Sequence, residues 1–245
     1  MKVRRLRILA GPNGSGKSSV YSKLKQTKDF HWGIFVNADE MEKLFRENGG
    51  LDVRQYGVDD FPWEVFKREY QPFVLLKNGR CGLDNLRYAD GRIEVLRTAE
   101  LDSYLASFVA DFIRRELLET KDNLVFTIET VMSHRSKLDF MCMAKEKGFR
   151  IYLYYVATSS PDINIGRVAA RVRNGGHNVP ANKIRSRYVR SLNNLRDAVR
   201  LSDRAYIFDN STSAYKWIAE YDARTGDLAL RTDEVPTWVV RYLLQ

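Results

Sequence analysis

The chain has 245 residues, of which 44% are hydrophobic and 12% aromatic, and its formal net charge is +9. This length and apolar content exclude a disordered chain and favour a single large domain, residues 1–245, that can bury a core. No apolar run approaches the roughly 18 residues that a membrane helix needs, so we expect no membrane partner.

The first predicted element is a strand over residues 6–10, a short apolar run that leads into a glycine-rich turn. The turn, Gly11-Pro12-Asn13-Gly14-Ser15-Gly16-Lys17-Ser18, fits the phosphate-loop (P-loop, Walker A) pattern G-x-x-x-x-G-K-[ST], and residues 18–25 read as a helix. In this context, backbone N–H groups and the helix N-terminus bind phosphates. We expect Lys17 to reach the β- and γ-phosphates of ATP, with GTP as an alternative, and Ser18 to bind Mg²⁺. The candidate nucleotide-binding residues are Gly11, Pro12, Asn13, Gly14, Ser15, Gly16, Lys17, Ser18 and Ser19.

A second strand is predicted over residues 33–37, and it leads directly to Asp39. In P-loop kinases that act on a hydroxyl, a carboxylate at such a strand end can accept the hydroxyl proton. Asp39 is therefore a candidate catalytic base. The structural alternative is that Asp39 only caps a helix over residues 40–47, since Asp is a favoured N-cap residue.

Residues 49–100 depart from the alternation of strands and helices and are interpreted as an inserted subdomain. They predict a helix from Trp63 to about Phe73 and a β-hairpin, residues 86–89 and 92–95, around the turn Asp90-Gly91. The insertion follows Asp39 along the chain, so it can extend over the acceptor side of the site. The alternative is a surface decoration without a role in catalysis.

A third strand, residues 124–129, ends on a group of polar residues. Polar side chains at the carboxyl ends of buried parallel strands face the ligand crevice. Glu129, Thr130 and Ser133 are therefore candidate substrate-binding residues, and Glu129 can also hold a water molecule on Mg²⁺. The alternative for Ser133 is a capping role ahead of the helix predicted over residues 136–147.

The remaining elements complete an α/β pattern. Strands are predicted over residues 150–157 and 204–209, a helix over 104–118, a second hairpin over 216–221 and 228–231, and a last helix over 237–244. Strands that alternate with helices indicate a parallel sheet. The predicted fold class is α/β, a P-loop NTPase-type, mostly parallel sheet with helices on both faces, an inserted subdomain and a C-terminal β-hairpin.

The positive charge is concentrated in residues 163–200, which contain eight arginines and Lys183 against Asp197 alone, or 9 − 1 = +8. We interpret this stretch as a basic lid over polyphosphate rather than a nucleic-acid track, which remains the less favoured alternative. Arg167, Arg171 and Arg173 are candidate catalytic residues, because guanidinium groups suit the charge of a transferring phosphoryl group. Gly175-Gly176 would let the lid bend. The alternative is a solvated basic helix.

The N-terminus and the cysteines indicate the compartment. The basic start of the chain has no small-residue cleavage site, so we expect no signal peptide. Cys81 and Cys142 lie far apart and form no C-x-x-C pair, which predicts neither a zinc site nor a disulfide framework. We therefore expect a cytoplasmic protein with reduced thiols.

Five segments, in this order, resemble the zeta-toxin family. They are Ala10–Ser18, Asn37-Ala38-Asp39, Glu129-Thr130, the run from Arg171 to Pro180 with its Gly175-Gly176-His177 lid, and Tyr206–Ser211. The resemblance covers most of the chain except about residues 49–100, and the lid belongs to a Gly-Gly-His branch of zeta-like proteins. It implies an ATP- and Mg²⁺-dependent small-molecule kinase, whose best-known relatives phosphorylate UDP-N-acetylglucosamine and act as toxins restrained by an antitoxin. It also implies that Lys17 and Ser18 hold phosphate and metal, that Asp39 is the base, that Glu129 lies in the substrate cleft, and that Arg167, Arg171 and Arg173 stabilise the transferred charge.

The sequence thus favours an ATP-dependent phosphotransferase that acts on the hydroxyl of a small molecule. The alternatives are a nucleic-acid-associated ATPase and a polynucleotide-end kinase. Two observations disfavour the nucleic-acid-associated ATPase: the chain has no L-S-G-G-Q stretch, and its basic residues gather in one region without a series of stacking aromatic residues. The polynucleotide-end kinase stays open as an intermediate possibility.

Overall fold

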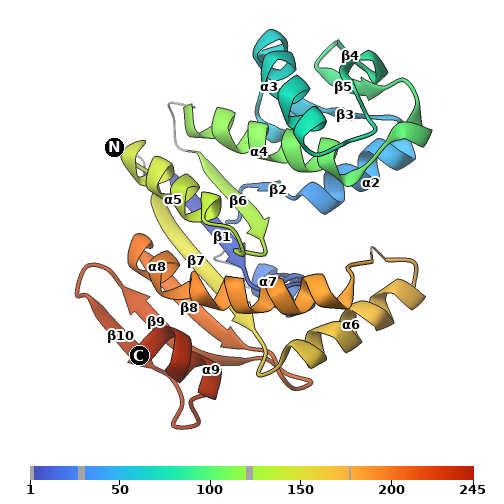
Figure 1. Cartoon of the computed structure of the whole chain (residues 1–245). Helices are drawn as coiled ribbons and strands as arrows, with labels where there is room; N and C mark the ends of the chain where they lie inside the picture. Colours follow the sequence, from blue (N-terminus) through green and yellow to red (C-terminus); the bar gives the residue numbers. More distant parts are fainter. Residues whose placement is uncertain (1–2, 27–30, 120–123, 177) are drawn as a thin grey trace. The chain divides into compact units, whose positions relative to one another are not determined.

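The computed structural model describes residues 3–26, 31–119, 124–176 and 178–245. By its internal contacts the chain divides into two compact units (Figure 1). The first unit consists of Met1–Gly33 and Asp122–Gln245, and the second consists of Ile34–Lys121. Each unit has its own sheet and its own core, and each is described by itself.

The first unit is built on a twisted sheet with strand order β10-β9-β8-β7-β1-β6. Strands β6, β1, β7 and β8 are parallel, and β9 and β10 continue the sheet as an antiparallel hairpin. The strands are β1 (Arg5–Ala10), β6 (Val125–Thr130), β7 (Arg150–Ala157), β8 (Arg204–Asp209), β9 (Lys216–Asp222) and β10 (Asp227–Leu230). Because parallel strands end at one edge of a sheet, the residues that follow β1, β6, β7 and β8 gather there.

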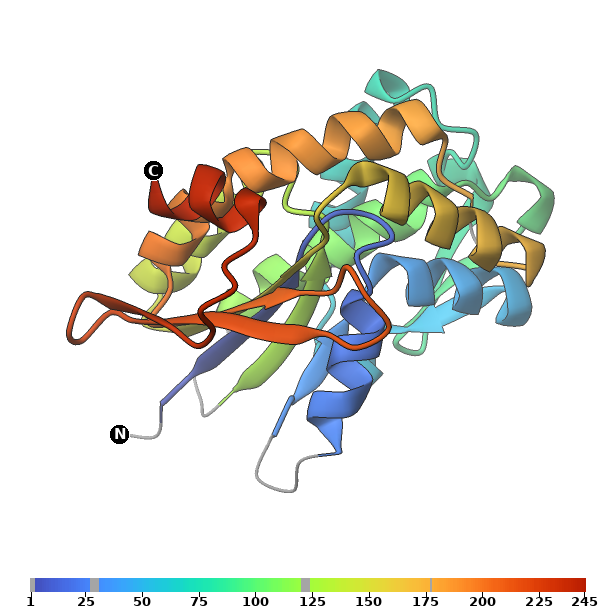
Figure 2. The same ribbon diagram turned by 90° about the horizontal axis from the view of Figure 1, so that it is seen from below.

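Helices cover both faces of this sheet, as Figure 2 shows. The helical segments are α1 (Lys17–Lys25), α5 (Ser136–Glu146), α6 (Pro161–Arg173), α7 (Ala181–Asn193), α8 (Leu195–Leu201), α9 (Thr237–Val239) and the π-helical turn η4 (Val240–Leu244). On one face, Val20 of α1 packs in a cluster with Leu9 and Val156. On the other face, the Tyr155 hydroxyl contacts Ser191 of α7. The predicted α/β fold class is therefore confirmed.

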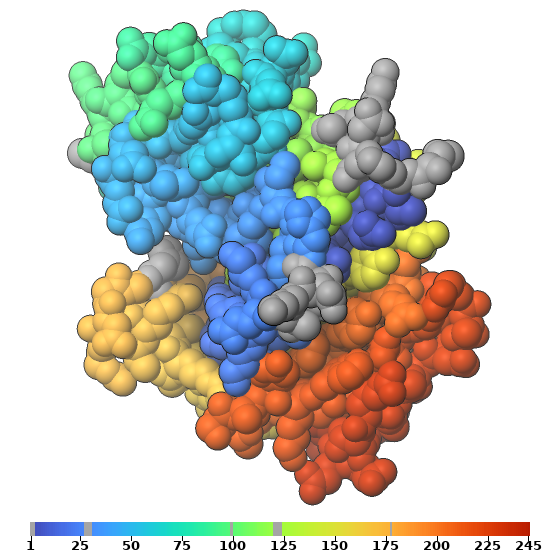
Figure 3. Space-filling view, turned by 180° about the vertical axis from the view of Figure 1, so that it is seen from behind, coloured from blue at the N-terminus to red at the C-terminus, as the bar shows by residue number. Residues whose placement is uncertain are grey.

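The burial of strand β7 explains why the sequence of this central strand is a nearly continuous apolar run. Residues 153–157 of this strand are all buried, since the strand has a neighbour on each edge and helices on each face. The C-terminal hairpin is different. Trp217 and Leu230 are 41% and 47% exposed, and β9 and β10 form part of the orange to red surface in Figure 3.

The second unit contains β2, five helical segments before its last helix, and a small antiparallel sheet with strand order β3-β5-β4. Its elements are β2 (Ile34–Val36), α2 (Ala38–Asn48), β3 (Gly50–Asp52), η1 (Val53–Tyr56), α3 (Trp63–Leu76), η2 (Leu83–Asn85), β4 (Leu86–Ala89), β5 (Arg92–Val95), η3 (Thr98–Glu100) and α4 (Ser103–Glu119). The hairpin predicted around Asp90-Gly91 is present, and both turn residues have positive φ, 49° and 75°. That backbone conformation matches the twist of paired strands.

Aromatic side chains form the core of the second unit. Phe66 of α3 lies 5.3 Å from Phe108 and 5.4 Å from Phe112 of α4, measured between ring centroids, and Phe61 joins the same cluster. Such ring pairs contribute about 0.5–1.5 kcal/mol each beyond the area that they bury. Residues expected to form an insertion therefore pack on α4 as part of one larger unit.

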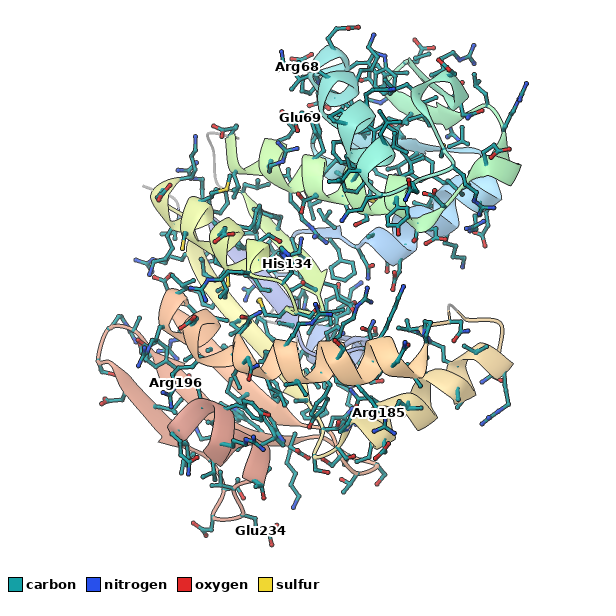
Figure 4. All side chains as sticks on the ribbon, viewed as in Figure 1. Arg68, Glu69, His134, Arg185, Arg196 and Glu234 are labelled. Carbon is teal, nitrogen blue, oxygen red and sulfur yellow. The ribbon has the colours of Figure 1, made fainter. Side chains whose placement is uncertain are left out.

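An ion pair between Glu69 of α3 and Arg115 of α4, 2.5 Å long, adds a polar link at the edge of that core; Glu69 is labelled in Figure 4. Both side chains are about one third exposed, so the pair contributes modestly to stability.

Among the described residues, no helix combines the length and the apolar character needed to cross a bilayer.

Candidate functional site

The glycine-rich turn between β1 and α1 has the backbone of a phosphate-binding loop. Gly11 has a φ of +140°, and a Cβ atom at this position would lie 1.9 Å from the Val156 carbonyl oxygen. No residue other than glycine fits so close to β7. The Gly11 N–H donates to the carbonyl oxygen of Thr130 at 3.2 Å, which ties the start of the loop to the end of β6.

Lys17 is the first residue of α1 and is 7% exposed. Its ammonium group donates to the carbonyl oxygens of Gly11 at 2.9 Å and Pro12 at 3.2 Å. It also lies 3.6 Å from a carboxylate oxygen of Glu129. The cation is thus held over the loop at the positive end of the helix dipole, where phosphate charge is stabilised.

A pocket of about 340 Å³ opens beside this lysine. Its lining comes from the loop, α1, the end of β6 and α6: Gly14, Gly16, Lys17, Ser18, Ser19, Glu129, Arg167, Val168 and Arg171. The lining contains three cationic residues and one carboxylate, so it carries a net positive charge. A cradle of backbone N–H groups, a helix N-terminus and converging cations fits the phosphates of a nucleotide.

Arg167 is held in place at this pocket by a contact outside it. Its Nη2 group donates to the carbonyl oxygen of Thr212 at 3.2 Å, while its Nη1 atom is buried and has no hydrogen-bond partner among the described residues. A buried unpaired guanidinium nitrogen is costly, which supports an anionic ligand at this position. Arg171 also lines the pocket. Arg173 is exposed and does not line it.

The two glycines of the predicted lid end helix α6. The Gly175 N–H donates to the Val172 carbonyl oxygen, the Gly176 N–H donates to the Arg171 carbonyl oxygen, both at 3.0 Å, and Gly175 has a φ of +79°. This pair of bonds is the Schellman motif that closes a helix. In this structure the glycines act as a C-cap; a hinge role stays a prediction. His177 lies outside the described residues.

The lid region contains most of α6, all of α7 and most of α8, and α6 and α7 pack on each other. Val168 of α6 packs with Val179, just before α7, and with Ile184 in the first turn of α7, in a small apolar cluster. Helix α7 is fixed to the sheet by Tyr188, whose hydroxyl donates to the Thr158 carbonyl oxygen at 2.6 Å. Burial raises the pKa of Tyr188 to about 12, so the hydroxyl remains a donor at neutral pH.

Two other arginines of this region, Arg185 and Arg187, make contacts of their own. Arg185, labelled in Figure 4, pairs with Asp162 at 2.6 Å, and both side chains are exposed. Arg187 directs its Nη1 group toward the Asn13 side chain of the phosphate loop, 3.5 Å away. Sequence reasoning did not single out Arg187. Its only local signal was its position in the basic stretch.

Ser18 is the candidate metal ligand, and its side chain lines the pocket. Among the described residues, no group of three His, Cys, Asp or Glu side chains is arranged to hold a metal ion. Phosphate oxygens together with the Ser18 hydroxyl stay the predicted ligands of a Mg²⁺ ion at this site. This ligand set fits Mg²⁺, which is usually bound through few protein groups and the phosphates of its nucleotide.

Thr130 and Ser133, unlike Glu129, do not line the pocket. Thr130 is buried, and its hydroxyl accepts a hydrogen bond from the Met132 N–H at 3.1 Å. Ser133 does not line the pocket. The expected capping role of Ser133 is wrong, because α5 begins after Arg135, with no side-chain cap.

Asp39 belongs to the second unit, in the first turn of α2. The N-cap of this helix is Asn37, whose side-chain oxygen accepts a hydrogen bond from the Asp39 N–H at 2.9 Å. The alternative that Asp39 caps the helix is therefore wrong. The Asp39 side chain is exposed, so its carboxylate is available to a ligand, and its role as a base stays a prediction.

Comparison with known proteins gives the family. A model of the AAA domain matches residues 6–195 of this chain. The chain belongs to this AAA domain family. An uncharacterized protein of Haemophilus influenzae is 35% identical to it over 68 residues, which are 28% of this chain and 49% of that protein.

Solved structures share the fold of this AAA domain protein at low sequence identity. The crystal structure of AvrRxo1-ORF1:AvrRxo1-ORF2 with sulphate ions matches with a TM-score of 0.58 and 16% identity, over 95% of this chain and 62% of that chain. The structure of the same complex with ATP matches with a TM-score of 0.56 and 16% identity, over 94% and 61% of the two chains. The chain thus spans about half the length of the curated relative and about three fifths of the solved ones.

Proposed function

We propose that this protein is an ATP-dependent phosphotransferase that phosphorylates a hydroxyl of a small molecule. The observation that carries the proposal is the pocket in which Lys17, Arg167 and Arg171 converge on the phosphate loop. Phosphoryl transfer is catalysed mainly by positioning and by electrostatic stabilisation, and these side chains supply both. The relative solved with ATP supports ATP as the nucleotide, and GTP is the alternative.

In the proposed reaction, the acceptor oxygen forms a bond to the γ-phosphorus while the bond to the β–γ bridging oxygen breaks, and ADP leaves. Asp39 accepts the proton of the acceptor hydroxyl. Lys17 neutralises charge on the β- and γ-phosphates, and Arg167 stabilises the equatorial oxygens of the transferring group. Ser18 would hold Mg²⁺, which when bound neutralises further charge on the phosphates.

The zeta-toxin-like sequence pattern narrows the proposed acceptor to nucleotide sugars such as UDP-N-acetylglucosamine. The pattern includes the phosphate loop, Asp39, Glu129 and the lid arginines, but not residues 49–100. The acceptor class is therefore the part of the proposal to test first. The same sequence pattern makes an antitoxin a proposed protein partner, in line with the two-component complex in which the solved relative crystallised.

The test is transfer of radiolabel from γ-labelled ATP into a panel of nucleotide sugars, antibiotics and oligonucleotides. We expect labelled product with a nucleotide sugar and none with Lys17→Ala, which removes the fixed cation of the loop. Lys25→Ala is the matched control, since it removes an exposed cation from the last turn of the same helix. Label found only on oligonucleotide ends would replace the proposal with a polynucleotide-end kinase, and ATP hydrolysis with no transfer to any acceptor would favour an ATPase.

A further inference from the structure

The segment that follows β8 touches the phosphate loop directly. Asn210 comes immediately after the strand, and its backbone N–H donates to the Ala157 carbonyl oxygen at the end of β7, at 2.8 Å. Its side-chain amide donates to the carbonyl oxygen of Ser15 at 2.8 Å. Asn210 is 9% exposed and Ser15 is fully buried, so this hydrogen bond lies out of reach of bulk water.

The same amide occupies the space that a glycine leaves open. Gly16 is the N-cap of α1 and has a φ of +89°. A Cβ atom at Gly16 would lie 2.0 Å from the Nδ2 atom of Asn210. The amide is thus packed against the Ser15-Gly16 peptide, the point from which α1 and the side chain of Lys17 start.

Two further contacts connect this segment to the lid side of the pocket. The Ser211 hydroxyl accepts a hydrogen bond from the Ser159 N–H at 2.8 Å, in the loop that leads into α6. The Thr212 carbonyl oxygen accepts the bond from Arg167 described above. Residues 210–212 therefore contact the phosphate loop, the loop that leads into α6, and Arg167, which lines the pocket.

Residues 210–212 are held in place by hydrogen bonds of the preceding residue, Asp209. Asp209, the last residue of β8, accepts a hydrogen bond from the Ser211 N–H at 2.9 Å. Its second carboxylate oxygen accepts from the indole N–H of Trp238 at 2.7 Å. Asp209 and Trp238 are 7% and 4% exposed, so the segment is anchored to α9 by a buried charge-assisted hydrogen bond.

We propose that Asn210 is a positioning residue for the nucleotide. Its amide fixes the Ser15-Gly16 peptide, and through it the N–H groups and the lysine that bind the phosphates, while the residues just after it hold Arg167. The inference rests on the proposed function only in requiring that the loop binds ATP. Asn210 need not touch the nucleotide, since it acts through the loop.

The first test measures the affinity of Mg·ATP and Mg·ADP by calorimetry for wild type and Asn210→Ala. The variant leaves the buried Ser15 carbonyl without its donor, and we expect about tenfold weaker binding, equivalent to about 1.4 kcal/mol. Ser202→Ala is the matched control. It also removes a buried side-chain bond to a carbonyl oxygen, 2.7 Å to Ala198, but just before β8 begins. Ser202→Ala should lose thermal stability and bind nucleotide like wild type.

A second variant, Asn210→Asp, keeps the size of the side chain and reverses its polarity. An ionised carboxylate cannot donate to the Ser15 carbonyl, whereas a protonated one can. We expect binding weaker than in Asn210→Ala at about pH 8, with recovery relative to wild type as the pH falls toward about 5. A role in stability alone would not give a pH-dependent nucleotide affinity, and this variant also serves if Asn210→Ala does not fold.

The outcomes separate the two proposals. If wild type binds ATP and both Asn210 variants bind it equally well at every pH, the positioning role is wrong and the proposed function stands. A folded wild-type protein that binds no nucleotide overturns both.

Discussion

The three lid arginines predicted from the sequence should differ strongly in their contribution to catalysis, and Arg167→Ala should have the largest effect. Arg167 is partly buried, is held by the Thr212 carbonyl oxygen and has a buried Nη1 atom beside the phosphate loop. Arg171 lines the same pocket from an exposed position, and Arg173 does not line it. The three variants remove the same cation from one helix, so they control for each other.

The size of the effect follows from burial. One well-placed donor to developing charge contributes about 10²–10³ in rate, and arginines in phosphoryl transfer reach about 10³ or more. We expect Arg167→Ala to lower kcat about 10³-fold, or about 4 kcal/mol. Arg171→Ala should lower it about tenfold, because exposed charges are screened, and Arg173→Ala less than about twofold. The kcat of Arg167→Lys should exceed that of Arg167→Ala by less than about tenfold. A single ammonium group cannot bond to the Thr212 carbonyl oxygen and to a phosphate at once, as the two nitrogens of a guanidinium group can.

The assay is steady-state transfer from γ-labelled ATP, with ADP affinity measured in parallel. ADP lacks the γ-phosphate, so its affinity should change little in Arg167→Ala while kcat falls. Two results would refute the reasoning: an Arg173→Ala variant as impaired as Arg167→Ala, or an Arg167→Ala variant that keeps more than about a tenth of the wild-type kcat.

Three further predictions concern other parts of the chain. Asp39→Asn should keep ATP affinity near wild type and lower transfer roughly 10²-fold or more; a collapse of ATP affinity with a normal residual rate would make Asp39 a structural residue. Shortening the hairpin between Leu86 and Val95 should raise the KM for the acceptor and leave ATP hydrolysis in its absence unchanged, because the hairpin belongs to the unit that carries Asp39; an unaltered KM in a folded variant would remove this role. The hydrogen bonds from Arg224, with Arg204 nearby, hold the pKa of Asp222 well below its usual 3.8, so Asp222 stabilises the fold above that pH and progressively less below it. The difference in Tm between wild type and Asp222→Asn should thus shrink as the pH falls below about 4, and a constant difference would contradict the assignment.

The parts of the fold that the sequence predicts well are those specified by local patterns. Strand β7 has the predicted bounds, because eight consecutive residues carry one buried-strand signal. The phosphate loop is recognisable because its glycines and its lysine lie within eight positions. Helix α7 was not predicted, although Ile184, Tyr188 and Leu192 repeat at helical spacing. The many arginines around them were interpreted as one basic stretch.

Other features of the site depend on contacts that no local pattern encodes. The hydrogen bond between Asn210 and Ser15 joins residues 195 positions apart. The sequence places Asn210 in the Tyr206–Ser211 segment of the family resemblance and after a buried strand, where polar residues face the ligand, but neither signal names Ser15 as its partner. The helix cap at Asn37 was missed for a different reason: Asn37 and Asp39 both suit an N-cap, and only the backbone decides between them.

The second unit is one continuous stretch of chain, and both of its ends join the first unit. Its aromatic core involves α3 and α4 and requires no residue of the phosphate loop. Residues of this stretch other than Asp39 can therefore change without altering Lys17, Arg167 or Arg171, which all belong to the first unit. A chimaera that exchanges Ile34–Lys121 for the matching segment of a relative would test whether this stretch selects the acceptor, provided that the incoming segment keeps a carboxylate at the position of Asp39.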